Sequence, residues 1–433
     1  MLETIRNAWK TPELRKRILF TLVCLIIFRF GSAIPVPFID KTALAQVLAN
    51  YENTILGFFN MMSGGAFEQA NIFALSIQPY INSSIIIQLL TVAIPALERM
   101  AKEGGEEGRK KIAAITRYAT VLIGLLQGFA YYMILKNGGA LITTGGLGSF
   151  FTAVVIILTF TAGTAFIMWL GEQITANGIG NGISIILFAS IVSRIPSIIN
   201  TVVNLMMSGA WNWLWVIALV VGLVALIGFI VFVTDAERRI PVQYAKRMVG
   251  RKMYGGRSTN LPIKVNMSGV MPIIFASSIA TFPATIAAFF PAPAAGSFWY
   301  NVQNYVFSPN SATYAVIYLI LIVLFSYFYA AISFNPVEIA NNLKNNGGFV
   351  PGFRPGRPTS DFISKVMNKI ILFGAIFLGI IAIIPILIGV FVPSGQSLAL
   401  GGTSLLIVVG VAQETVKQME SQLMMRNYKG FLE

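Results

Sequence analysis

The sequence contains no histidine, a single cysteine and few charged residues. Of its 433 residues, 31 are Lys or Arg and 17 are Asp or Glu, which together make 11% of the chain, whereas a soluble chain carries about 25%. Without histidine, the chain cannot build His-metal sites, Ser-His or Cys-His catalytic pairs, or His proton relays. Cys24 cannot form a disulfide within the chain, and its apolar setting favours a buried side chain. These absences exclude most enzyme chemistry and place the chain among membrane proteins.

Apolar residues make up 56% of the chain and gather into ten runs of membrane length. Because backbone groups in lipid must be hydrogen-bonded within their own segment, such runs predict helices. The second and tenth runs are the weakest, since they contain several polar residues. The runs cover residues 18–36, 77–97, 112–135, 150–170, 182–205, 213–233, 268–290, 312–333, 369–392 and 398–415.

Basic residues indicate the orientation. Apart from Arg29, Lys41, Lys136 and Arg194, we assign the lysines and arginines to the two termini and to the loops that follow even-numbered runs. The positive-inside bias makes that side cytoplasmic, with both termini inside. Five runs then precede a connector at about 200–212 and five follow it, so the halves have opposite orientation, as in inverted repeats.

Three cytoplasmic segments, 98–111, 234–264 and 335–369, are rich in charge, and the last two are about 30 residues long. One interpretation is that their basic residues only set the topology and attract anionic lipid. Their length and their Gly/Pro turn chemistry favour a docking surface for an acidic or RNA-bearing partner. On the external side, residues 37–76 are either an ordinary loop or a segment that folds back into the protein as a short helix.

The spans carry little charge. Arg29 is the clear charged residue inside a run, while Glu172 and Glu414 lie at inner ends, so the carboxylates of an ion-coupled transporter are missing. No Gly-x-x-x-x-Gly-Lys phosphate loop is present. A secondary transporter, a membrane enzyme and a scaffold therefore remain weaker alternatives to a channel.

Uncharged polar residues and paired aliphatic residues occur together in the spans. The polar side chains act either as ordinary interhelical contacts or as a seam that opens; they are Asn82, Ser83, Ser84, Gln88, Gln127 and Asn266. Ile81 and Ile85 share one helical face, and Ile183 and Leu187 repeat that spacing. Such pairs are compatible with plain packing or with a hydrophobic constriction that gates a pore.

Eight stretches, in order along nearly the whole chain, closely resemble the SecY family, the pore subunit of the bacterial Sec translocon. They are PYINSSIIIQ at 79–88, EGGEEGRKK at 103–111, GIGNGIS at 178–184, RRIPVQYAKR at 238–247, LPIKVNM at 261–267, FASS at 275–278, GGFVPGFRPG at 347–356 and GGTSLLI at 401–407. Each alone is weak, but together they are specific.

The resemblance implies an all-α polytopic membrane protein: ten transmembrane helices in two inverted, pseudo-symmetric five-helix halves around an hourglass pore, with a short plug helix. The implied pore ring is Ile81, Ile85, Ile183, Leu187, Ile274 and Ile407. The implied plug, at about 57–75, includes Phe58, Phe59, Asn60, Met61, Met62, Ser63, Gly64, Gly65 and Phe67. The implied lateral gate is lined by Asn82, Gln88, Gln127, Asn266 and Phe282.

The resemblance also implies the domains and partners. A cytoplasmic segment 1–17 precedes the N-terminal half 18–205, and an external connector 206–212 leads to the C-terminal half 213–415 and a cytoplasmic tail 416–433. The implied docking residues are Arg238, Arg239, Lys246, Arg247, Arg251, Lys252, Arg354 and Arg357. Phe353 stands before Arg354 where many family members have a smaller aliphatic residue.

We therefore expect a non-enzymatic channel in the bacterial plasma membrane that translocates unfolded proteins and releases transmembrane segments sideways. Expected partners are SecE and SecG subunits, the SecA motor, the ribosome, signal peptides with their unfolded substrates, anionic lipids and a YidC-type insertase, but no DNA. No cofactor or metal is expected.

Overall fold

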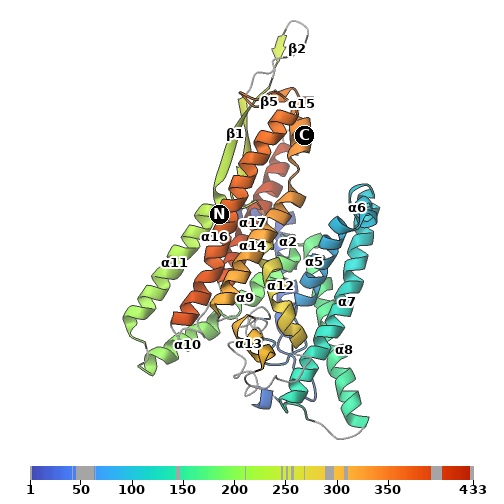
Figure 1. The fold of residues 1–433 in the computed structure, drawn as a ribbon, viewed down its shortest axis with the longest axis vertical. Coiled ribbons are helices and arrows are strands. Elements are labelled where there is room, and N and C mark those ends of the chain that lie inside the picture. Colours follow the sequence, from blue (N-terminus) through green and yellow to red (C-terminus); the bar gives the residue numbers. More distant parts are fainter. Residues whose placement is uncertain are drawn as a thin grey trace.

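The chain folds into a mostly helical protein, shown as a ribbon in Figure 1. The computed structural model describes residues 2–40, 42–44, 63, 65–142, 147–209, 211–244, 247–249, 252–254, 258–267, 269–287, 297–306, 311–391 and 402–429. Its helices are α1 Leu2–Lys10, α2 Pro12–Gly31, α5 Gln78–Ala93, α6 Pro95–Lys102, α7 Gly105–Asn137, α8 Leu147–Asn177, α9 Gly182–Val192, α10 Ile195–Met207, α11 Trp213–Asp235, α12 Met271–Ala287, α13 Phe298–Tyr305, α14 Ala312–Ser333, α15 Pro336–Asn345, α16 Arg357–Phe391 and α17 Gly402–Lys429.

Each of the ten predicted runs overlaps one of these helices. Within the described part of the chain, six helical segments are long and apolar enough to cross a membrane, and a seventh is possible if α5 and α6 count as one span. Those two helices meet at an angle of 101°. The break lies at Pro95, which cannot donate a backbone hydrogen bond and keeps Ile94 extended.

Two groups of helices meet around α12. Figure 1 shows α5, α6, α7 and α8 on one side of the molecule and α11, α14 and α16 on the other. Helix α5 packs on α7 and α7 on α8, while α14 packs on both α12 and α16. Helix α12 also contacts α5 and α7, so it joins the two groups.

The expectation of an all-α fold was wrong for the basic segments. Residues 234–264 contain β1 Glu237–Tyr244 and β4 Ser258–Lys264, which pair antiparallel from Glu237↔Lys264 to Gln243↔Ser258. β5 Gly348–Phe349 pairs with the end of β1, and the short strands β2 Arg247–Val249 and β3 Lys252–Tyr254 pair with each other. The reason is that Ile240 and Val242 alternate with exposed residues and therefore have an apolar side to bury.

This sheet forms one subdomain with the second basic segment. Residues 335–369, expected to be a loop, contain α15, β5 and the first turns of α16. Their apolar side chains pack with those of β1 and β4; the buried members of the cluster are Ile240, Val242, Ile263, Val350 and Ile363. In Figure 1, β1, β5, α15 and one end of α16 lie together at one end of the molecule.

Glycine allows a very close approach between α8 and α9. A Cβ on Gly182, the first residue of α9, would overlap the backbone carbonyl oxygen of Gly171 on α8 and lie 2.8 Å from Ile174 Cβ. Backbone atoms cannot move aside as a flexible side chain can. By contrast, a Cβ on Gly222 in the middle of α11 meets no atom within 4 Å.

We expect Gly182→Ala to destabilise the protein by about 1–3 kcal/mol, because the added methyl forces the two backbones apart. Gly222→Ala is the matched control and should be neutral or stabilising by up to about 1 kcal/mol, since alanine favours the helix and finds open space. Thermal unfolding of the purified variants in detergent measures both. Equal melting temperatures for the two variants would contradict the close approach.

Candidate pore, seam and cytoplasmic docking surface

The six aliphatic residues predicted as a pore ring lie on four helices and pack into one cluster. Ile81 and Ile85 come from α5, Ile183 and Leu187 from α9, Ile274 from α12 and Ile407 from α17. Five of them are at most 7% exposed and belong to the same buried cluster, and Ile183 is partly buried against it. Ile183 keeps part of its surface exposed, and the cluster joins α5 to α12.

The local sequence determines where α5 and α9 begin, and therefore in which direction these side chains point. Pro79 lies in the first turn of α5, where its missing N–H costs nothing. Asn181 caps α9, with its Oδ1 accepting hydrogen bonds from the backbone N–H of Ile183 at 3.1 Å and of Ser184 at 3.3 Å. The spacing of four residues then points the second aliphatic of each pair in the same direction.

A polar seam accompanies the cluster between α5 and α12. Gln78 Nε2 donates a hydrogen bond of 3.4 Å to Ser278 Oγ across the two helices, and both residues are buried. One turn further along α5, Asn82 is also buried. Oε1 of Gln78 and Oδ1 of Asn82 accept no hydrogen bond from the described residues. A buried acceptor without a partner costs about 1–3 kcal/mol, so this seam is not optimally closed.

The residues predicted to line a lateral gate do not all contact one another among the described residues. Gln88, half-buried on α5, donates a weak bond of 3.5 Å to Ser84 on its own helix. Gln127 is half-buried on α7. Asn266 lines a small cavity with residues of α14 and α16, including Ser326 and Gly374. The side chain of Phe282 lies outside the described residues. Gln78 and Ser278, which do meet across the helices, were missed; Ser278 stood in the FASS stretch.

The plug prediction falls partly on residues that the structure does not describe, namely Phe58, Phe59, Asn60, Met61, Met62 and Gly64. The described Ser63 and Phe67 are buried, with Phe67 N–H bonded to Ser63 Oγ at 3.0 Å. Residues 65–70 and 72–77 form turns, and the earlier part of the predicted plug helix, 57–62 and 64, lies outside the described residues. Tyr131 of α7 fastens this segment, because its Oη donates a 2.6 Å hydrogen bond to the carbonyl of Phe67 and the two rings meet edge to face at 4.4 Å.

The described members of the predicted docking set belong to the subdomain that the two basic segments form. Arg238 and Arg239 are exposed on β1, and Arg354 and Arg357 are exposed at and before the start of α16. Lys246 and Arg251 lie outside the described residues. Arg247 and Lys252 belong to β2 and β3, but the structure does not describe their side chains. The β1–β5 pairing holds the two basic segments side by side.

The loop that carries Arg354 is anchored on both sides. Gly352 and Gly356 have φ of +88° and +101°, which allow the sharp path of the loop. The ring of Phe353 stacks on Phe362 of α16 with centroids 4.1 Å apart, and Thr359 Oγ1 donates to the Arg354 carbonyl at 2.8 Å. The large residue before Arg354 therefore has a structural use: it fixes the loop and leaves the guanidinium exposed.

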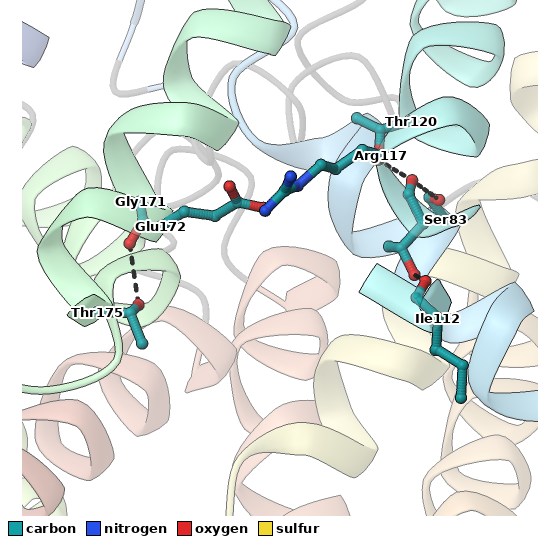
Figure 2. Close-up of polar contacts among 8 residues, drawn as sticks. Ser83, Ile112, Arg117, Thr120, Gly171, Glu172 and Thr175 are labelled. Carbon is teal, nitrogen blue, oxygen red and sulfur yellow. Dashed lines mark hydrogen bonds and ion pairs between the residues drawn. The ribbon is translucent and has the colours of Figure 1, made fainter. Parts of the chain in front are cut away.

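Charge within the spans was underestimated from the sequence. Arg117, inside the third run, was overlooked; it pairs with Glu172 of α8 through Nε and Oε1 at 2.8 Å. Figure 2 shows this pair reaching between its two helices. Ser83 Oγ of α5 donates to the Thr116 carbonyl of α7 at 2.8 Å. Arg29 of α2 contacts a different part of the chain: its Nη1 donates a hydrogen bond of 3.3 Å to Ser193 Oγ, just after α9. The ties in Figure 2 fasten α5, α7 and α8 together.

Comparison with known proteins gives a consistent result. The SecY family model matches residues 71–416. The chain is 45% identical to the protein translocase subunit SecY of Streptomyces scabiei, over 100% of both chains.

Two solved structures share the fold. One is a structure of a SecY protein, whose plug domain is described as stabilising the closed state of the translocation channel and maintaining a membrane seal. It has a TM-score of 0.63 at 16% identity, with 96% of both chains covered. The other is Sec61 in the canine ribosome-channel complex from the endoplasmic reticulum, with a TM-score of 0.61 at 17% identity and 96% coverage of both chains.

We expect Arg117→Gln and Glu172→Gln each to destabilise the protein by about 0.2–1 kcal/mol, because the pair is partly exposed and water weakens it. Exchanging the charges, with Arg117→Glu and Glu172→Arg together, should recover part of that loss. Unfolding of the purified variants in detergent, analysed as a double-mutant cycle, measures the interaction. Glu106→Gln is the control, since its 3.2 Å pair with Lys110 lies within one exposed helix turn. A swap no better than the sum of the single changes would contradict the tie.

Proposed function

The chain belongs to the SecY family, and from that premise we propose that it is the pore-forming subunit of a channel that carries unfolded proteins across the bacterial plasma membrane. The observation that supports the proposal best is the meeting of Ile81, Ile85, Leu187, Ile274 and Ile407 in one buried cluster between the two groups of helices. No catalytic step is required of the chain, and a motor, a ribosome or the membrane potential supplies the driving force.

An aliphatic constriction suits a channel for protein chains. An unfolded substrate cannot cross lipid, because each bare peptide group loses its hydrogen bonds to water there at a cost of several kcal/mol. A wet passage removes that cost. A single layer of Ile and Leu side chains then blocks ions by excluding water when closed. The same side chains make no directional bonds, so they part around any sequence.

The seam between α5 and α12 is our candidate for the sideways exit. Gln78 and Asn82 are buried on the α5 side, their side-chain oxygens accept no hydrogen bond from the described residues, and the 3.4 Å bond from Gln78 to Ser278 crosses the seam. Opening would let water or substrate reach those oxygens, which offsets part of the loss of packing. An apolar signal segment that binds the open seam better than the closed one would shift the population towards the open state.

The buried turns at 65–77 support a plug role for the segment that precedes them. They lie against α7 and α8 in a cluster with Tyr131 and Phe160. A segment seated there on the external side would fill the outer funnel at rest. Gln88, Gln127, Asn266 and Phe282 remain the expected further gate residues.

The cytoplasmic subdomain is the proposed docking surface for a SecA-type motor and for the ribosome. Its exposed arginines come from two segments that β1 and β5 hold together, so a partner contacts both at once. Arginine is well suited to carboxylate and phosphate recognition. SecE and SecG subunits, signal peptides, anionic lipids and a YidC-type insertase complete the proposed partners.

The proposed topology has both termini in the cytoplasm and ten spans in two inverted halves, 18–205 and 213–415, joined outside at 206–212. The segments 1–17 and 416–433 are cytoplasmic in this arrangement. The positive-inside bias supports it, since the exposed arginines of the sheet and of the Arg354 loop fall on the cytoplasmic side.

Ile81→Asn or Ile85→Asn should raise the ion conductance of the resting channel, because an amide at the constriction retains water. Conductance of the reconstituted complex across a planar bilayer measures the leak. Ile86→Asn is the matched control, since Ile86 is 40% exposed on the same helix and away from the cluster. An unchanged leak in both test variants would remove these two residues from the seal.

Arg354→Glu should reduce motor- or ribosome-dependent transport at least about tenfold, since a charge reversal at a docking contact typically costs several kcal/mol. The melting temperature should not change, because the guanidinium is exposed. Transport into inverted vesicles measures the effect. Lys136→Glu is the control, because it also reverses the charge of an exposed basic residue but lies at the outer end of α7. This variant should transport normally. Full transport by Arg354→Glu would exclude this residue from docking.

A further inference from the structure

Two of the helices that carry the candidate ring meet at the cytoplasmic side of the ring. Gly410 of α17 packs on Val270, just before α12, where a Cβ on the glycine would lie 2.9 Å from Val270 Cγ1. Ile274 follows Val270 by about one helical turn, and Ile407 precedes Gly410 by about one turn. This contact therefore sets the separation of two ring side chains.

The base of the β1–β4 hairpin is joined along the chain to the Gly410–Val270 contact. Its two ends are closed by the backbone bond from Val265 N–H to the Ala236 carbonyl, 2.9 Å long. From Val265 the chain runs on through residues 266–270 into α12, so the hairpin is joined covalently to one ring helix.

Asp235 connects the hairpin base to the second ring helix. It is the last residue of α11 and directly precedes Ala236. Its Oδ1 accepts from Lys417 Nζ of α17 at 2.6 Å, and its Oδ2 accepts from Gln413 Nε2 of the same helix at 3.4 Å. Gln413 is 3% exposed, so this second contact is held inside the protein.

We propose that Asp235 is a positioning residue that clamps the cytoplasmic hairpin to α17, so that a partner acting on the hairpin moves α17 as well as α12 and displaces both Ile407 and Ile274 from the closed ring. The proposal rests on the proposed function, because it requires a channel whose partner docks on this hairpin. Without the clamp, force on the hairpin reaches α12 through the backbone, and reaches α17 through apolar packing alone: the Gly410–Val270 contact and the packing of α11 on α17. The clamp adds a polar attachment, about three turns along α17 from the ring residue.

The clamp contributes more to coupling than to stability. Asp235 and Lys417 are 47% and 43% exposed, and exposed ion pairs add little to the free energy of unfolding. Loss of coupling can therefore be separated from loss of folding. The appropriate evidence that Asp235 and Lys417 couple the hairpin to α17 is an interaction energy between them, measured from the transport rates of the single and double variants.

The test uses the full-length chain in its complex, reconstituted in vesicles with the motor. The variants are Asp235→Asn, Lys417→Met and the charge exchange Asp235→Lys with Lys417→Asp. Motor binding, melting temperature, resting conductance and transport per bound motor are measured for each. Glu98→Gln is the control, because it breaks an exposed ion pair of the same 2.7 Å class with Lys102, remote from the hairpin.

We expect each single variant to lower transport per bound motor about threefold to fivefold, the range an exposed ion pair supports, with motor binding and melting temperature unchanged. The charge exchange should restore most of the rate. Equal transport per bound motor in the wild type and both single variants would overturn the clamp while leaving the channel function intact. A wild-type complex that binds the motor but transports nothing would overturn the proposed function, and the clamp with it.

Discussion

Aliphatic contact between the two groups of helices is the interaction on which the rest of the structure depends. Side chains from α5, α9, α12 and α17 meet in one buried cluster, and dispersion and exclusion of water hold them there. Such contact has no directional requirement, so it can be lost and regained without leaving a broken hydrogen bond. The polar groups beside it behave differently. Gln78 and Asn82 are buried, and their side-chain oxygens accept no hydrogen bond from the described residues, which makes the observed arrangement less favourable than apolar packing alone would.

Around that cluster, the hydrogen bonds and ion pairs between helices are unevenly distributed. Hydrogen bonds and an ion pair fasten α5, α7 and α8 to each other, through Ser83 and through Arg117 with Glu172. Asp235 joins α11 to α17, and strand pairing joins the two basic segments. Among the described residues, α5 and α12 are joined by apolar contact and by the 3.4 Å hydrogen bond from Gln78 to Ser278. The hydrogen bond described across this boundary is therefore longer than those that fasten α5, α7 and α8.

Much of the helical framework could be predicted from sequence, because a run of about 20 apolar residues has few alternatives in lipid. The spacing of Ile81 and Ile85 likewise placed both on one buried face. The cytoplasmic sheet could not be predicted in this way: β1 has a short alternating pattern interrupted by Pro241, and β5 has two residues, so its pairing depends on tertiary contact. Arg117 was missed because one charge hardly changes the hydropathy of a long run. The Gln78–Ser278 contact needed three-dimensional proximity between residues 200 positions apart.

The pairing of β1 with β5 also restricts how the surface formed by the two basic segments can vary. Gln243 and Tyr244 pair with Phe349 and Gly348 across the two strands, and Val350 belongs to the same buried cluster as Val242. A chimaera that receives the first basic segment from a relative and keeps its own second segment would combine two halves of different interfaces. The two segments must therefore be exchanged together, because replacing one of them alone would disrupt the strand pairing between them.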